Sequence, residues 1–367
     1  MEKKDQIKEE EQKQYILFKK VSVVDKANFY EYISVMIDGG VSFTEALESV
    51  DAKIDGVFFK EKIMELLMYI QSGDSFSKSM KKMPDIFESS EVSIVEAGEQ
   101  TGTLVQALAK LSEDLKKIHN LRKKITGALT YPFIIFLFLI LAVIIVLVYV
   151  IPAITPLFTD SDVELPLATQ ALVATSDFVK GNLALLFLFF ASLYVMYIGY
   201  RSTKSGREQL DQIVLHMPLV GKVYKNYILS NISASFASLI GSGVSIMSTL
   251  KLVGKSCNNE IYEQLFNMVI HRVSQGEKIV DSMREVDPLK IYFPADFTQM
   301  LSVGEKTATL ENISRKLNNQ YEKEVEYSLA SLTKWIEPLA ILLAGLFVSW
   351  FAFAIFGAIM KVTQTVG

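Results

Sequence analysis

The sequence is poor in the residues that build disulfides, metal centres and catalytic pairs. Its 367 residues include one cysteine, Cys257, which excludes an internal disulfide framework and a zinc site made of several thiolates. Its three histidines, His119, His216 and His271, stand far apart in the sequence. A catalytic histidine needs a partner, and the residues beside these three supply none, so we expect each to be a surface or packing residue.

Motifs of nucleotide-binding and hydrolytic enzymes are missing as well. The chain contains no Gly-x-x-x-x-Gly-Lys-Ser/Thr loop, no His-Glu-x-x-His and no Gly-x-Ser-x-Gly. With 37 basic and 41 acidic residues the net charge is −4, which excludes a protein that binds nucleic acid over its whole surface. We therefore expect no enzymatic activity, no cofactor, no metal site and no nucleic-acid partner.

Apolar sequence is abundant. Half of the residues are hydrophobic and the mean hydropathy is +0.28, a value typical of membrane proteins. Three runs contain no charged residue, at 133–150, 183–200 and 339–360. A bilayer core of about 30 Å needs about 20 helical residues, so the runs predict three membrane spans. Pro132 and Pro338 precede the first and third runs, where we expect a helix or half-helix to begin because a missing N–H costs little there.

Basic residues near the runs predict their orientation. Six precede the first run and three follow the second: Lys110, Lys116, Lys117, Arg122, Lys123, Lys124, Arg201, Lys204 and Arg207. The segment 152–182 between these runs has one lysine and four acidic residues. Since basic flanks stay in the cytoplasm, we expect 152–182 to be an external loop, the N-terminus to be cytoplasmic and the C-terminus external.

The two long polar segments of the chain are similar to each other. Residues of the first recur in the second at an offset of 203; the pairs include Ile37 and Ile240, Gly40 and Gly243, Val41 and Val244, Leu47 and Leu250, Gly73 and Gly276, and Met80 and Met283. A three-residue insertion then changes the offset to 206, at which Gly98-Glu99-Gln100-Thr101-Gly102-Thr103-Leu104 matches Gly304-Glu305-Lys306-Thr307-Ala308-Thr309-Leu310. The match is ordered and long, so we interpret it as an internal repeat.

Both copies have the pattern of helices. In the first copy we expect helices at 26–38, 57–71, 76–82 and 89–97, and a long helix that starts at Thr103. The pair Gly39-Gly40 suits a left-handed helix end, and Ser42 with Glu45 is typical of a capping box. No alternation typical of strands competes. We therefore expect an all-α, polytopic membrane protein with three transmembrane helices and two repeated cytoplasmic bundles of about six helices each.

The domain plan follows from the repeat and the apolar runs. The expected parts are a charged N-terminal tail at 1–20, a first cytoplasmic bundle at 21–131, transmembrane helices at 132–151, 183–200 and 339–360, the external loop at 152–182, a second cytoplasmic bundle at 201–338, and a short external tail at 361–367. Residues 1–14 have mixed charge with no long apolar run behind them, so we expect no secretory signal. Small residues such as Gly345 and Ala352 permit close helix approach, so we expect self-association within the bilayer.

Two groups of residues are candidates for structural or interaction roles. We interpret the segment that starts at Gly98 as a helix break in which two glycines, Gly98 and Gly102, release the chain and Thr103 caps the next helix. The alternative is that Glu99 and Glu305 face a partner or a cation at an interface.

The second group lies at the third span, where Glu337 stands immediately before Pro338. A carboxylate there would gain from the dipole of a helix N-terminus and would anchor the span at the membrane surface. The alternative is a packing or coupling contact between the second bundle and the membrane helices.

From Phe29 to Met360 the chain resembles the inner-membrane platform proteins of type IV pilus and type II secretion systems. The resemblance rests on the two helical repeats, on the motif at Gly98 with its twin at Gly304, on the prolines before two spans, and on the order of spans and polar segments. It implies a non-enzymatic platform in the inner membrane. The partners that it implies are a cytoplasmic hexameric assembly ATPase, pilin or pseudopilin subunits, other inner-membrane assembly proteins, and further copies of the chain in the lipid bilayer.

Two other classes of membrane protein remain as alternatives. A transporter or channel would need ionisable residues inside the spans, and the three runs contain none. A receptor with helical cytoplasmic domains would predict a sizeable external domain, whereas the expected external loop has 31 residues.

Overall fold

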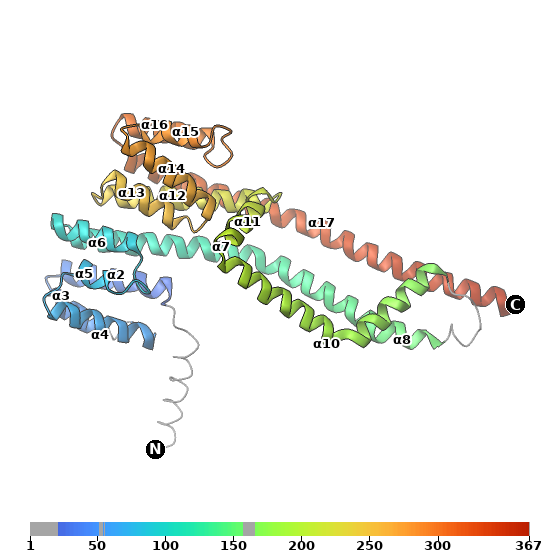
Figure 1. Ribbon diagram of the computed structural model, residues 1–367. Helices are drawn as coiled ribbons and strands as arrows, with labels where there is room; N and C mark the ends of the chain where they lie inside the picture. The colour runs from blue at the N-terminus through green and yellow to red at the C-terminus, as the bar shows by residue number, and fades with distance from the viewer. Residues whose placement is uncertain (1–20, 51–53, 55, 157–165, 367) are drawn as a thin grey trace, which may run out of the picture. The chain divides into compact units, whose positions relative to one another are not determined.

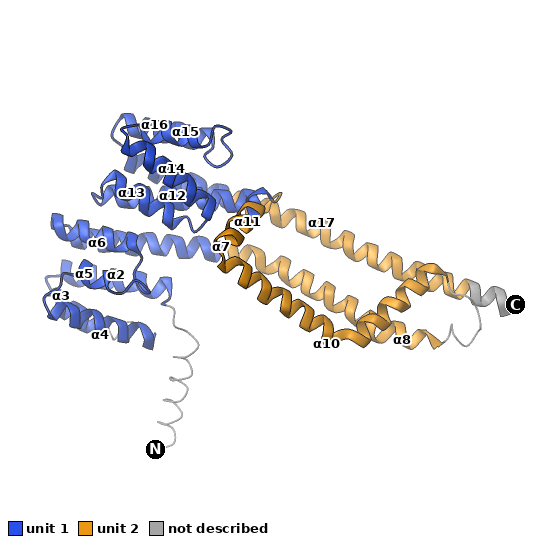
Figure 2. Cartoon of the chain, in the orientation of Figure 1, with its two compact units in different colours: residues 1–124, 214–216, 221–325 blue, residues 125–213, 217–220, 326–367 orange. Residues whose placement is uncertain are grey.

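The computed structural model describes residues 21–50, 54, 56–156 and 166–366, and every element within these ranges is a helix, so the all-α prediction is confirmed. The expected tail at 1–20 lies outside the described residues. The chain forms two compact units (Figure 2). Unit 1 comprises residues up to 124, 214–216 and 221–325, and unit 2 comprises 125–213, 217–220 and 326–366.

Twelve of the described helices lie wholly or mainly in unit 1 or start there (Figure 1). They are α2 (Val23–Asp38), α3 (Phe43–Ser49), α4 (Val57–Gln71), α5 (Phe76–Lys81), α6 (Ser89–Thr101), the start of α7 (Leu104–Ile145), α12 (Val220–Gly241), α13 (Ile246–Ser256), α14 (Glu260–Ser274), α15 (Ile279–Val286), α16 (Ala295–Lys306) and the start of α17 (Leu310–Val366). The last residues of α11 (Lys204–His216) also belong to this unit.

The helix ends in unit 1 follow the signals of the sequence. α2 ends at Asp38, and the backbone then passes through Gly40 with a φ of 86°. α12 is followed in the same way by Gly243, whose φ is 82°. Glycine has no Cβ and adopts this left-handed conformation without strain. The expected helix at 57–71 has the bounds of α4, and the Ser42 hydroxyl accepts the N–H of Glu45 at 3.3 Å, which is one half of the expected capping box.

The predicted role of Gly98 is wrong. α6 continues through Gly98 to Thr101, and the left-handed residue is Gly102, with a φ of 72°. A Cβ on Gly98 would lie 2.8 Å from the Cβ of Ala107 on α7. Gly98 therefore allows α6 and α7 to approach closely, a contact between residues nine positions apart that the local sequence pattern does not reveal.

Aromatic side chains fill the centre of unit 1. The Phe29 ring contacts Phe59, with centroids 5.6 Å apart, and also Phe87. In the second half Phe293 contacts Tyr262, with centroids 5.8 Å apart. The offsets of 203 and 206 pair Phe59 with Tyr262 and Phe87 with Phe293, so both halves bury an aromatic ring at corresponding points of the apolar core.

Three stretches of helix in the described part of the chain are long and apolar enough to cross a membrane, at Leu104–Ile154, Leu167–Ser202 and Leu310–Met360. The second lies in unit 2, and the first and third start in unit 1 and continue into unit 2. The prediction that a helix begins at Pro132 or Pro338 is wrong, because α7 and α17 run through these prolines (Figure 1). In hydrocarbon, a broken helix would leave several peptide groups without partners, whereas a proline within a helix forfeits about one hydrogen bond.

Much of the described part of 152–182, the segment expected to be an external loop, is helical. The first span ends in a π-helical turn, η2 (Val146–Val150), followed by α8 (Ile151–Ile154), and α10 already begins at Leu167. α10 carries a non-helical residue, Asn182, one position before the predicted second span. The Ser176 hydroxyl donates to the carbonyl of Leu147 in the π-helical turn, and the Thr169 hydroxyl donates to the carbonyl of Ala354. These bonds join α10 to the other two apolar stretches.

The paired positions Gly102 and Ala308 generate a reciprocal prediction. Ala308 has a φ of 55°, and an L-residue in this region costs about 1–2 kcal/mol. We expect Ala308→Gly to stabilise the protein by about 0.5–1 kcal/mol and Gly102→Ala to destabilise it by about 1 kcal/mol. A Cβ at Gly102 would meet nothing within 4 Å, so conformation alone decides the sign. Urea unfolding of the full chain in detergent would measure both, and shifts of the same sign would contradict the explanation.

Candidate functional site

The carboxylate of Glu99, in the motif that begins at Gly98, binds the start of a neighbouring helix. Its two oxygens accept the backbone N–H groups of Phe76 at 2.7 Å and Ser77 at 3.3 Å, which are the first two residues of α5. The Ser77 hydroxyl also donates to this carboxylate. The first N–H groups of a helix have no partner within it, so Glu99 on α6 caps α5 from outside.

Glu305 makes the same arrangement in the second half of the chain. Its carboxylate accepts the N–H groups of Ile279 at 2.6 Å and Val280 at 3.2 Å, the first residues of α15. Each glutamate thus joins two consecutive helices, α5 to α6 and α15 to α16, and places a negative charge at a helix N-terminus. The sequence pattern did not reveal these caps, although the recurrence of a glutamate at an offset of 206, as Glu99 and Glu305, was visible in it.

A buried ion pair lies in the first half of unit 1. The Lys26 ammonium on α2 lies 2.7 Å from a carboxylate oxygen of Glu91 on α6, and the two residues are only 6% and 3% exposed. Lys26 also donates to the carbonyl of Ile86, and Tyr30 donates to the second oxygen of Glu91. Burial raises the pKa of the Glu91 carboxyl, and the adjacent Lys26 charge opposes this effect.

The corresponding positions in the second half are apolar. The offset of 203 pairs Lys26 with Leu229, and the offset of 206 pairs Glu91 with Phe297. Both Leu229 and Phe297 are fully buried. At one location in the core, the first half therefore has an ion pair and the second half has two apolar side chains. Any function of a buried charge at this location belongs to the first half alone.

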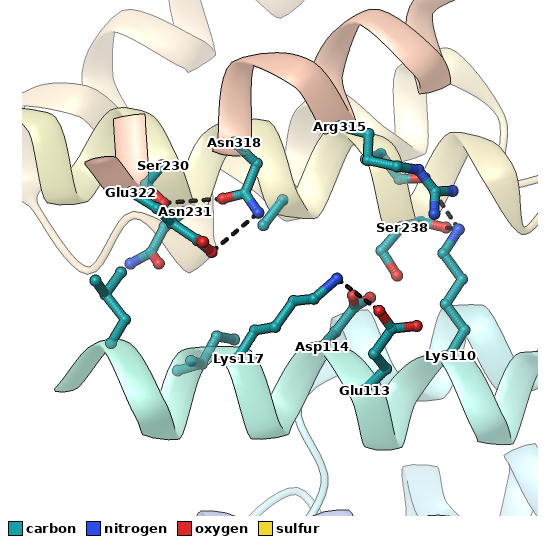
Figure 3. Close-up of a pocket in the computed structure, with 14 residues that line it drawn as sticks. Lys110, Glu113, Asp114, Lys117, Ser230, Asn231, Ser238, Arg315, Asn318 and Glu322 are labelled. Carbon is teal, nitrogen blue, oxygen red and sulfur yellow. Dashed lines mark hydrogen bonds and ion pairs between the residues drawn. The ribbon is translucent and has the colours of Figure 1, made fainter. Parts of the chain in front are cut away.

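A polar pocket lies within unit 1 between α7, α12 and α17 (Figure 3). It offers about 40 Å³ to the centres of water-sized molecules, which is room for a few ordered waters. Its polar lining comes from three helices: Lys110, Glu113, Asp114 and Lys117 from α7, Ser230, Asn231 and Ser238 from α12, and Arg315, Asn318 and Glu322 from α17. The α7 residues point toward the other two helices.

Lys110 ties α7 to the end of α12. Its ammonium donates to the carbonyls of Ala237 at 3.0 Å and Ser238 at 3.1 Å, in the last turn of α12. A cation is favourable there because the helix dipole leaves negative charge at the C-terminus. Burial lowers the pKa of the Lys110 ammonium, and the charges of Asp114 and Glu311 oppose this effect.

Asp114 brings an unsatisfied group to the pocket. Its Oδ2 atom is buried and has no hydrogen-bond partner among the described residues. Burial raises the pKa of the Asp114 carboxyl, opposed by the nearby Ser238 hydroxyl and by the charge of Lys110. A buried acceptor of this kind is usually satisfied by water. On the α17 side, the Asn318 amide links Ser230, at 2.9 Å, to Glu322, at 3.1 Å.

The polar and charged lining of the pocket suits contacts between α7, α12 and α17. No group of three His, Cys, Asp or Glu side chains in the described part of the chain is placed to hold a metal ion. The spacing of residues 110, 113, 114 and 117 places four charges on one face of α7. That spacing was a signal in the sequence, but nothing local indicated which helices this face would meet.

The remaining predicted residues lie elsewhere. Pro132, Glu337 and Pro338 belong to unit 2, whereas the glutamate caps belong to unit 1. Glu337 is exposed and lies in the interior of α17. The expectation that it gains from a helix N-terminus is therefore wrong, because α17 begins at Leu310 and the dipole charge is confined to the first turn.

The glutamate caps generate a stability prediction. We expect Glu99→Ala and Glu305→Ala each to lower the free energy of unfolding by about 1–2 kcal/mol, because each leaves the N–H groups of a helix start without acceptors. The exposed Glu96 on the same helix as Glu99 is the control, and Glu96→Ala should change stability by less than about 0.5 kcal/mol. Urea unfolding of the full chain in detergent would measure these changes. If Glu99→Ala behaves like the control, the cap is unimportant.

The buried ion pair generates a prediction of pH dependence. In Lys26→Met, the Glu91 carboxylate loses its cation, and we expect a loss of about 3 kcal/mol at neutral pH. Because the folded-state pKa of Glu91 is raised, its protonation favours the folded state, so the loss should shrink as the pH falls towards 5 and grow as the pH rises through that pKa. The control is Lys116→Met at the exposed Lys116–Glu31 pair, with a loss below about 1 kcal/mol. A Lys26→Met loss that is independent of pH would contradict this account.

Comparisons with known proteins agree with the arrangement of the chain. The family model described as type II secretion system (T2SS), protein F, matches residues 29–152 and 232–358. These segments begin and end at positions that the offsets of 203 and 206 pair. Together they cover more than half of the chain and include both halves of unit 1 with two of the apolar stretches.

Curated relatives align over nearly the whole length. The type IV pilus assembly protein PilC of Thermus thermophilus is 29% identical over 341 residues, 93% of this chain and 83% of the relative. PilC of Pseudomonas aeruginosa is 26% identical, over 95% of this chain and 92% of the relative. The type II secretion system protein F of Aeromonas hydrophila is 23% identical, over 90% and 84% respectively. The chain belongs to the type II secretion system protein F family, which includes the PilC proteins of type IV pilus assembly.

Proposed function

We propose that this protein is the inner-membrane platform of a type IV pilus or type II secretion machine. In this role it anchors a cytoplasmic hexameric assembly ATPase and helps to move pilin or pseudopilin subunits from the bilayer into a filament. The observation that carries the proposal is the family match, which extends over both polar segments and the apolar stretches that follow them. The names of the relatives place them in pilus assembly and secretion.

The proposed topology follows from the distribution of basic residues. Unit 1 would lie in the cytoplasm, the connection between α8 and α10 would be external, and the C-terminus would be external. Six basic residues precede the first apolar run and three follow the second, whereas the connection is acidic. Only a cytoplasmic unit 1 would be accessible to a soluble ATPase.

The long helices suit a platform that transmits displacement. α7 has 42 residues and α17 has 57, and each starts in unit 1 and continues into unit 2 without a break. At 1.5 Å per residue they are about 60 and 85 Å long. Near their starts both contribute charged side chains to the polar pocket, and Lys110 fixes α7 to α12. A push on this part of unit 1 would therefore move rigid helices that enter the membrane.

We also propose that the two halves of unit 1 are copies of one helical bundle. Each half has five helices followed by the start of a long apolar one. Paired positions share a positive φ, at 97° for Gly73 and 94° for Gly276. The glutamate caps at Glu99 and Glu305 bind corresponding helices, α5 and α15.

A binding experiment tests the proposed function. We expect the full chain in detergent or nanodiscs to bind the cognate assembly ATPase and to hydrolyse no ATP by itself. Because lysines and acids are interspersed on the exposed surface of unit 1, the affinity should fall as salt is added. A variant without residues 26–120 and 215–330 should lose the binding, and empty nanodiscs are the background control. Binding that persists in this variant, or hydrolysis that survives stringent purification, would contradict the platform role.

A further inference from the structure

Helix α11 and the turn after it expose apolar side chains outside the three predicted spans. Ile213 is 57% exposed, Met217 and Leu219 are each 45% exposed, and Val220 is 39% exposed. Leu219 has a φ of 66°, a conformation that costs energy for a residue with a Cβ. The turn thus holds an apolar side chain in solvent on a strained backbone, for which packing within the described chain gives no reason.

The start of α11 is fixed to the last turn of α10. A Cβ on Gly206 would lie 2.1 Å from the carbonyl oxygen of Tyr200, so only glycine allows this approach. The Thr203 hydroxyl donates to the same carbonyl at 2.7 Å and accepts the N–H of Gly206 at 3.2 Å. The Tyr200 hydroxyl donates to Gln209 at 2.6 Å, which holds the middle of α11 as well.

Most of α11 belongs to the apolar unit, since only its residues 214–216 fall in unit 1. The turn at 217–220 belongs to unit 2, although the residues on either side of it belong to unit 1. The second apolar run ends at Tyr200, and α11 begins only four residues later. Figure 1 shows the chain turning sharply between α10 and α11. The start and the middle of α11 are therefore held close to the point where α10 would leave a bilayer.

The charges of this segment are sorted by exposure. The exposed charged residues of this segment are all basic, namely Arg201, Lys204 and Lys222, and a fourth basic residue, Arg207, is half-buried. The two acidic residues are covered to a greater degree, since Asp211 is 7% exposed and Glu208 is half-buried. Exposed cations beside exposed apolar side chains are typical of a helix that lies at a membrane surface and binds anionic headgroups.

We propose that α11 and the turn at Met217–Val220 form an interfacial anchor that lies on the bilayer surface. Ile213, Met217 and Leu219 enter the boundary between headgroups and acyl chains, and the basic residues bind anionic lipid. We favour the bilayer over a soluble partner because α11 follows the apolar helix α10 directly. If α10 crosses the membrane, α11 starts at the membrane surface, where a soluble partner would have to displace lipid.

Lipid quenching of a site-specific fluorophore tests the anchor. The full chain with Cys257→Ala would carry one new cysteine, Ile213→Cys, Met217→Cys or Leu219→Cys, labelled with the fluorophore NBD. Each variant would be reconstituted into vesicles that contain phosphatidylglycerol and a lipid with a doxyl spin label high on its acyl chain. Leu289→Cys is the matched control, because Leu289 is 78% exposed and also lies in a turn with a positive φ, at Lys290.

We expect blue-shifted emission and stronger quenching at the three α11 sites than at Leu289, and weaker quenching when phosphatidylcholine replaces phosphatidylglycerol. Leu219→Gly, which suits the backbone conformation, should keep the fold and reduce quenching of a label at Ile213. Quenching equal to that of Leu289 would overturn the proposal. A blue shift that depends on protein concentration without lipid quenching would also overturn it, because a second copy would then cover the surface. Quenching that is the same in both lipids would overturn the role of anionic headgroups.

Discussion

A peptide group placed in hydrocarbon has no water to bind, so its N–H and C=O must find partners within the protein. This requirement explains why α7 and α17 continue through Pro132 and Pro338. It also explains the hydroxyl bonds from α10, where Ser176 binds the carbonyl of Leu147 in the π-helical turn. Because α7 and α17 continue as helices into the apolar region, unit 1 contains the first turns of two helices that extend into unit 2.

In unit 1, side chains supply hydrogen-bond partners for backbone groups at the ends of helices. Its helices are short, and short helices have a large share of unpaired backbone groups at their ends. Glu99 and Glu305 satisfy two such groups each. Lys110 approaches the carbonyls of the last turn of α12. These three charged residues thus hold helix ends in unit 1.

Local signals in the sequence predicted the features that depend on near neighbours. The bounds of α4, the end of α2 at Gly39-Gly40 and the three apolar stretches follow from patterns within a few residues of each site. The roles of Gly98 and Glu99 depend on contacts across a turn or between helices, so the pattern identified the residues but not what they do. The Lys26–Glu91 pair joins residues 65 positions apart, and no local pattern indicates such a contact.

The difference between the two cores bears on how the chain avoids folding into the wrong partner. Proteins with similar repeats misassemble when an element of one repeat occupies its counterpart's place in the other. If α2 and α12 exchanged places, the Lys26 ammonium would be buried at the position of Leu229, near Phe297 in place of Glu91, and Glu91 would be left without a cation. A buried charge without a partner costs several kcal/mol. The divergence of these two pairs therefore makes an exchange of α2 and α12 unfavourable, so that the buried ion pair favours the correct assembly of the two halves.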